Sequence, residues 1–134
     1  MTTMRTANND LARPGKALNI VLWTLQVLAA LAFVAAGSGK LLGGQDMVTL
    51  FEAVGIGQWF RYATGSLEVL GALLLILPGK TAFGAVLLAC VMAGAVVVHL
   101  TVLHTAPTAP LVLLALTALI AWGRRSQLPG LLGS

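Results

Sequence analysis

Four apolar runs divide the chain, and short polar or turn-forming segments separate them. The runs cover residues 17–39, 60–77, 81–103 and 108–122. Each is close to the roughly 20 residues that a helix needs to cross the hydrocarbon core of a bilayer, although the last is shorter. No run alternates apolar and polar residues with the period of two that marks a strand. The pattern therefore predicts an all-α integral membrane bundle of four transmembrane helices.

The longest connection, residues 43–57, predicts a short interfacial helix between the first and second spans. Its apolar side carries Met47, Leu50, Phe51 and Val54. Glu52 falls on the opposite side, where it would face solvent. The segment is either an ordinary interfacial connector or a lid over a site.

Composition agrees with a membrane protein. Hydrophobic residues make up 58% of the chain and charged residues only 9%, against about 25% charged in a soluble domain. A net charge of +4 would suggest nucleic acid as the partner of a soluble protein. Here the basic residues lie at the ends of the apolar runs, which indicates orientation in a lipid bilayer and no nucleic-acid partner.

Lysine and arginine residues gather on one side of the predicted membrane. With the amino terminus inside, the inner side carries Arg5, Arg13, Lys16, Lys80, Arg124 and Arg125. The outer side carries only Lys40 and Arg61. Cytoplasmic segments are enriched in Lys and Arg, so we expect both termini in the cytoplasm. Residues 1–16 and 124–134 then form cytoplasmic tails around a transmembrane domain of residues 17–123.

An alternative for the first run is a cleaved signal peptide, since residues 34–36 resemble a cleavage site. Its apolar stretch of about 20 residues exceeds the 7–15 that are typical of a signal peptide, which favours a retained span.

A single glutamate, Glu68, lies in the middle of the second apolar run. A charged side chain near the bilayer centre costs roughly 3 kcal/mol on insertion scales, so it normally faces protein and has a function. At helical spacing, the strongly polar residues within the first three runs share stripes with small residues. These stripes consist of Trp23, Gln26, Ala30, Phe33, Gly37 and Lys40 in the first run, Arg61, Gly65, Glu68, Ala72 and Leu75 in the second, and Ala85, Ala89, Met92, Val96 and His99 in the third. Small residues let helices approach closely in lipid, so the stripes predict the bundle interior.

Depth narrows the choice of partners for Glu68. At 1.5 Å per helical residue, Glu68 lies about 12 Å below Phe60, and His99 lies about 6 Å below the outer end of its own run. Lys40 lies at the outer rim, whereas Gln26 lies in the inner half. A buried charge needs a partner, and Lys40 and His99 are the nearest candidates.

These residues define a candidate site whose function has three interpretations. The candidate polar cluster or ligand-binding site comprises Glu68, Lys40, His99, Gln26 and Arg61. Candidate pocket-lining residues are Gly37, Gly65 and Met92, because small residues leave room beside the polar stripe. Three interpretations stay open: a contact that pins the helices, a pocket for an amphipathic small molecule with its polar group toward Glu68, and conduction of protons or ions.

Other chemistries find no support in the residues. Cys90 is the only cysteine, so no disulfide forms within the chain, and we expect it to be a small packing residue. His99 and His104 are about 140° apart around a helix and do not share a face. We therefore expect no metal site and no haem ligand cluster.

Two segments in order carry a family resemblance. The stretch from Phe33 to Leu41, which includes Gly39-Lys40, and the stretch from Gly65 to Ala72, which includes Glu68, resemble the DoxX family of small four-helix membrane proteins. The stretch Met92-Ala93-Gly94-Ala95-Val96, His99-Leu100 and the terminal Arg124-Arg125 fit the same pattern. The resemblance covers residues 18–125, and the lysine and glutamate of the family correspond to Lys40 and Glu68.

The resemblance implies an accessory subunit of a membrane redox complex, linked to quinones or thiols, in the bacterial cytoplasmic (inner) membrane. It suggests quinone as the cofactor, and other membrane redox proteins or a second copy of the chain as partners. Eukaryotic relatives look like assembly chaperones. The alternative is therefore a non-catalytic membrane binding or assembly protein in which Glu68 only fixes helix packing. Neither the residues nor the resemblance assigns a reaction to the chain.

Overall fold

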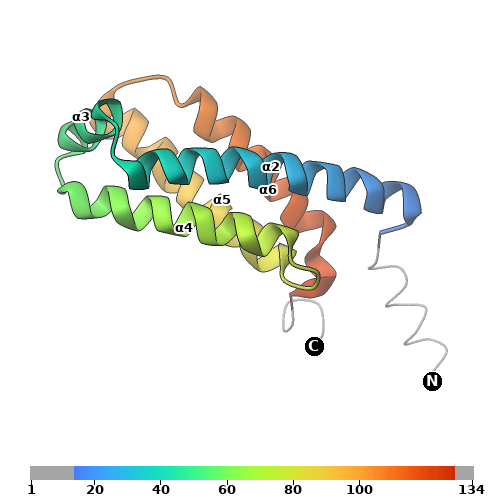
Figure 1. The fold of residues 1–134 in the computed structure, drawn as a ribbon. Helices are drawn as coiled ribbons and strands as arrows, with labels where there is room; N and C mark the ends of the chain where they lie inside the picture. Colours follow the sequence, from blue (N-terminus) through green and yellow to red (C-terminus); the bar gives the residue numbers. More distant parts are fainter. Residues whose placement is uncertain (1–13, 129–134) are drawn as a thin grey trace.

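The computed structural model describes residues 14–128, and these form a bundle of helices (Figure 1). The elements are α2 (Lys16–Leu42), α3 (Gln45–Val54), α4 (Gln58–Ile76), α5 (Thr81–Val98), the π-helical turn η1 (His99–Leu103), α6 (Thr108–Gly123) and the 3₁₀ turn η2 (Arg125–Gln127). No strand occurs within this range. The predicted all-α class is confirmed.

Three of the helices are long and apolar enough to cross a membrane: α2, α4, and α5 continued by η1. They correspond to the first three predicted runs. The fourth run corresponds to α6, which is apolar but has only 16 residues. Of the predicted tails, residues 1–13 and 129–134 lie outside the described range, and so do Arg5 and Arg13.

The connections follow from glycine and proline positions. Helix α2 ends at Gly43, whose φ of 69° is left-handed, and α3 ends at Gly55 in the same conformation. The helix predicted within residues 43–57 is α3, with Phe51 buried and Glu52 exposed. Pro78-Gly79 forms the turn between α4 and α5, and Gly79 has a φ of 81°. Sharp turns at these points make neighbouring helices antiparallel.

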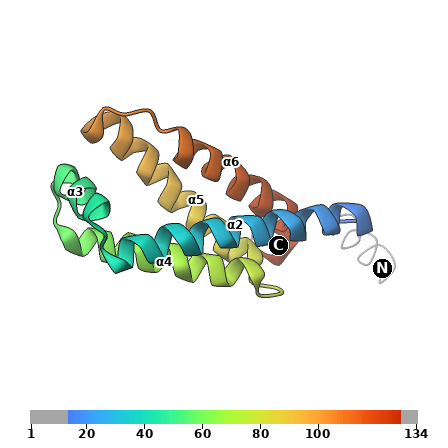
Figure 2. The ribbon, with the colours of Figure 1, turned by 45° about the horizontal axis from the view of Figure 1, so that its top comes forward.

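The helices pack in chain order, α2 on α4, α4 on α5 and α5 on α6, while α2 meets α6 over a shorter contact. Helix α2 begins and α6 ends at one end of the bundle, here called the terminal end. There Gly123 lies against Leu22, with no room for a side chain. Toward the other end, which carries α3 and η1 and is called the α3 end, the pair α5–α6 diverges from the pair α2–α4 (Figure 2).

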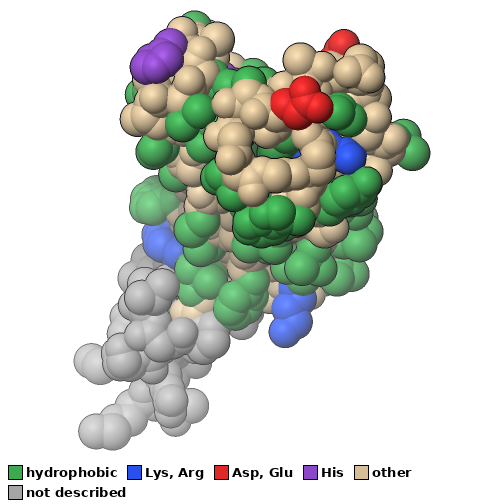
Figure 3. Space-filling model, turned by 90° about the vertical axis from the view of Figure 1, so that its left-hand side faces the viewer, with side chains coloured by type: hydrophobic (Ala, Val, Ile, Leu, Met, Phe, Trp, Pro, Cys, Tyr) green, Lys and Arg blue, Asp and Glu red, His purple; other side chains and the backbone are tan. Residues whose placement is uncertain are grey.

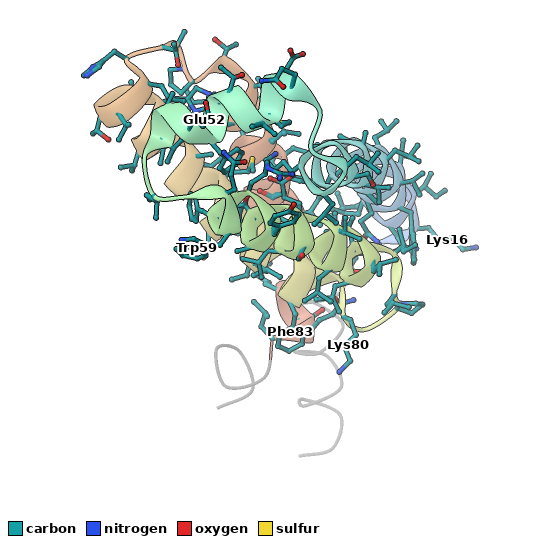
Figure 4. The ribbon with its side chains drawn as sticks, turned by 60° about the vertical axis from the view of Figure 1, so that its left-hand side comes forward. Lys16, Glu52, Trp59, Lys80 and Phe83 are labelled. Atoms are coloured by element: carbon teal, nitrogen blue, oxygen red, sulfur yellow. The ribbon has the colours of Figure 1, made fainter. Side chains whose placement is uncertain are left out.

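The predicted stripes lie in the interior. All five residues of the second stripe are buried, as are four of the first and two of the third, while the remaining members are partly exposed. Large hydrophobic side chains cover the flanks of the bundle instead (Figure 3). Trp59 points outward from α4 (Figure 4). Lys16 and Lys80 extend from one end of the bundle, and Glu52 lies at the other end. A surface this apolar fits contact with a lipid bilayer.

Helices α2 and α4 approach each other closely at Gly37 and Gly65. A Cβ atom on Gly37 would lie 2.8 Å from the carbonyl oxygen of Gly65, and one on Gly65 would lie 3.0 Å from the carbonyl oxygen of Gly37. Backbone therefore meets backbone at this crossing, as small residues permit in membrane bundles. By contrast, a Cβ on Gly39 would meet nothing within 4 Å.

The crossing yields a matched pair of substitutions. Gly37→Ala should lower the free energy of unfolding by about 1–3 kcal/mol, because the added methyl group forces the two backbones apart. Gly39→Ala on the same helix should be neutral or stabilising by up to about 1 kcal/mol, since Ala favours the helix more than Gly. Thermal unfolding in detergent measures both. Equal midpoints for the two variants would contradict the crossing.

Candidate functional site

Glu68 forms an ion pair with Lys40. The Nζ atom of Lys40 lies 3.0 Å from Oε1 of Glu68 and donates a hydrogen bond to Oε2 at 3.2 Å. The pair joins the middle of α4 to the last turn of α2. The Glu68 side chain is 2% exposed and that of Lys40 is 18% exposed. Two charges held this far from solvent neutralise each other, and loss of either one would leave the other unpaired.

Arg61 bonds to the end of α2 and not to Glu68. Its Nη1 donates to the backbone oxygen of Lys40, and its Nε donates to Oε1 of Gln58 at 2.8 Å. The carbonyl groups in the last turn of a helix have no partner within the helix, so this contact caps α2. Gln58 in turn donates to the backbone oxygen of Val48 on α3 at 3.0 Å. Arg61 and Gln58 thus tie α2, α3 and α4 together beside the ion pair.

A cavity of about 550 Å³ lies at the α3 end, where the two helix pairs diverge. Its walls come from α2, α3, α4, α5, η1 and α6, and most are apolar, including Phe33, Leu50, Phe51, Met92, Val98 and Leu113. The strongly polar side chains on its wall are Lys40, Glu68, Thr64 and His99. An apolar cavity with a few convergent polar groups is the usual form of a small-molecule site.

His99, one of the two candidate partners of Glu68, lies on the cavity wall but bonds to another residue. Its Nδ1 lies 2.8 Å from the backbone oxygen of Ala95. A carbonyl oxygen only accepts hydrogen bonds, so Nδ1 is the donor, and in this tautomer Nε2 is an acceptor. His99 opens η1, a π-helical turn of a kind often found at functional sites. His104 lies beyond that turn, exposed and with a φ of 52°.

Gln26 belongs to a second polar cluster, at the terminal end, which sequence reasoning missed. Its Nε2 donates to the backbone oxygen of Leu75 at 2.8 Å, and its Oε1 accepts from Nε of Arg124 at 2.7 Å. Arg124 also donates through Nη1 to Oδ1 of Asn19 at 2.7 Å, and Thr81 donates to Leu75 at 3.0 Å. These bonds fasten α2, the α4–α5 turn and the end of α6. Arg124 was predicted to begin a tail; it is 8% exposed, and burial lowers the pKa of its guanidinium.

Of the predicted pocket-lining residues, Met92 lines the cavity. Gly37 and Gly65 lie instead at the α2–α4 crossing, where each meets the backbone of the other helix. A small residue in a stripe provides space for a ligand or for a neighbouring helix, and sequence alone does not distinguish the two. Phe51 and Val54 of α3 also lie on the cavity wall.

Cys90 is exposed and lines the cavity, whereas we expected it to be packed within the bundle. Among residues 14–128, no three His, Cys, Asp or Glu side chains come together in a way that could hold a metal ion.

The model of one protein family, described as the DoxX-like family, matches residues 24–121. The chain belongs to the DoxX-like family. The match includes Lys40, Glu68, His99 and the cavity-lining segments of every helix, so this DoxX-like chain carries both the ion pair and the cavity within its family region. With its apolar helices, it is a membrane protein. No curated protein and no solved structure gives a significant match.

The ion pair can be tested by a double-mutant cycle. Lys40→Met and Glu68→Leu should each lower the free energy of unfolding by about 3–5 kcal/mol, because each leaves a buried charge unpaired. The double variant should lose less than the sum, with a coupling energy of about 1–3 kcal/mol. Thermal or chemical unfolding in detergent gives the values.

His99→Ala provides the comparison for this cycle. Since its hydrogen bond goes to Ala95, its effect should add to that of Glu68→Leu with a much smaller coupling energy. Equal coupling of Glu68 to Lys40 and to His99 would contradict the assigned pairing.

Proposed function

We propose that this DoxX-like protein is a membrane-embedded binding protein for an amphipathic small molecule, with quinones as the favoured class. The observation that carries the proposal is the apolar cavity of about 550 Å³ with the Lys40–Glu68 pair on its wall. A volume of this size is in the range of ligand sites, roughly 300–1,000 Å³. Glu68 and Lys40 serve as the polar contact, and the apolar walls hold the body of the ligand.

The donor set fits a quinone. The aromatic and aliphatic walls, including Phe33, Phe51 and Met92, suit a ring and an apolar tail. The polar contact suited to a ring oxygen comes from Lys40, whose ammonium group is a donor on the cavity wall. A bound quinone would supply two-electron redox chemistry, and the role of the protein's own residues would be to hold and orient it. We place the chain as an accessory subunit of a quinone- or thiol-linked redox complex in the bacterial cytoplasmic membrane, a role supported by the family resemblance.

The proposal includes an arrangement in the membrane. Helix α6 is the fourth span, because it runs along α5 and ends at the same end at which α2 begins. The terminal end, with Lys16, Lys80, Arg124 and Arg125, faces the cytoplasm, and α3 with Asp46 and Glu52 lies outside. The cavity then lies in the outer half of the membrane.

Reporter fusions test this arrangement. A reporter that is active only in the periplasm should be active when fused at Gln45 in α3. It should be inactive when fused after Gln127, because an even number of spans returns the chain to the cytoplasm. Activity at the second position would rule out four spans with both termini inside.

Ligand binding can be tested with a substitution that fills the cavity. Gly94 lines the cavity, and a Cβ atom there would meet nothing within 4 Å. We expect decylubiquinone to raise the melting temperature of the wild type in detergent, and Gly94→Leu to abolish the shift by occupying the cavity. Gly39→Leu is the matched control, since Gly39 also has open space but does not line the cavity.

Two results would count against the proposal: no shift for the wild type at saturating decylubiquinone, or an equal shift for Gly94→Leu. The second candidate function would then be favoured, a non-catalytic assembly protein in which the ion pair fixes helix packing. The observation that favours this candidate is that Glu68 already has a complete partner in Lys40 without any ligand.

A further inference from the structure

The polar groups of the cavity determine which head group it accepts, an inference that rests on the proposed function. We propose that the cavity selects amphiphiles with an uncharged carbonyl or hydroxyl head group and excludes carboxylates and ammonium compounds with the same tail. The class is wider than quinones and includes long-chain alcohols and ketones. Charge balance and hydrogen-bond capacity lead to it independently.

The charges on the cavity wall balance each other. Apart from His99, the acidic and basic side chains that line the cavity are Lys40 and Glu68. They lie 3.0 Å apart and cancel each other, so the wall has no net charge. A charged head group would enter an apolar cavity without a free counter-charge, and an unpaired charge is strongly disfavoured in such surroundings. A carboxylate head group would need a free cation as its partner, and Lys40 is already paired with Glu68.

The hydrogen-bond donors and acceptors on the cavity wall also limit the head group. A lysine ammonium group has three N–H donors, and contacts to the two oxygens of Glu68 leave one. His99 contributes the acceptor Nε2, because its Nδ1–H is used by Ala95. The hydroxyl of Thr64 donates to backbone oxygens of its own helix, at 2.9 Å for Phe60. One free N–H on Lys40 suits a carbonyl oxygen, and Lys40 and His99 together suit a hydroxyl group.

Cys90 gives a direct readout of occupancy. It is the only cysteine of the chain, it is exposed, and it lies on the cavity wall. The rate of its modification by N-ethylmaleimide in detergent can be followed by mass spectrometry. The probes are tetradecanol, the methyl ketone of the same chain length, tetradecanoate and tetradecyltrimethylammonium. Tetradecanol and the ketone should slow modification at concentrations at least about tenfold lower than the two ions.

Two variants should change this preference in opposite directions. Glu68→Gln leaves Lys40 without a counter-charge, so tetradecanoate should protect Cys90 at lower concentrations than tetradecanol does. Lys40→Met leaves Glu68 unpaired, so tetradecyltrimethylammonium should instead protect Cys90 at lower concentrations than it does in the wild type. Glu52→Gln removes the same charge from the exposed face of α3 and should keep the wild-type order. If a cavity variant does not fold, the measurements with the four probes on the wild type test the head-group preference without it.

The outcomes separate this inference from the proposed function. Protection by tetradecanoate or tetradecyltrimethylammonium equal to that by tetradecanol would overturn the head-group selectivity and leave amphiphile binding standing. No protection by any of the four probes would overturn the binding function itself. An unchanged order of probes in folded Glu68→Gln would also contradict the charge argument.

Discussion

Neutralisation of one carboxylate is the constraint on which the α3 end of this protein depends. Glu68 lies inside an apolar bundle and needs a cation within contact distance. Lys40 reaches it from α2 because α2 and α4 approach backbone to backbone at Gly37 and Gly65, one turn from the pair. Arg61 then caps the same end of α2. The glycine crossing, the ion pair and the cap therefore form one unit, and weakening the crossing would expose the charge.

The two ends of the bundle use polar residues differently. At the terminal end, Gln26 and Arg124 bond to each other. Gln26 also bonds to the backbone near the end of α4, and Arg124 bonds to α2, which joins the helices tightly. At the α3 end, the polar bonds run within the α2–α3–α4 side, and no comparable bond in the described residues draws α6 toward α2. The helix pairs diverge there and enclose the cavity. A tightly joined end and an open end are thus consequences of where the hydrogen bonds between helices lie.

The length of the apolar runs was enough to predict the helices. Helical spacing predicted most of the buried interior positions, because lipid-facing and protein-facing residues differ in size and polarity. Depth along the helices also limited the partners of Glu68 to Lys40 and His99. The choice between these two depends on the crossing of α2 and α4, which no local pattern encodes. The partnership of Gln26 with Arg124 spans most of the chain, and Arg124 follows an apolar run in a position typical of a tail. Cavity walls depend on the divergence of helices, so Gly94 and Cys90 carried no signal.

The contact of Gly123 with Leu22 gives the bundle a mechanical property. Helix α6 is held against α2 at that contact and lies apart from it at the other end, so together with α5, along which it packs, it would act as a lever with its fulcrum at the terminal end. Its 16 residues make it about 24 Å long. A tilt of about 5° would therefore move its far end by about 2 Å, close to the radius of a methyl group. A rotation of this size about Gly123 and Leu22 would widen the α3 end of the bundle without unfolding any helix.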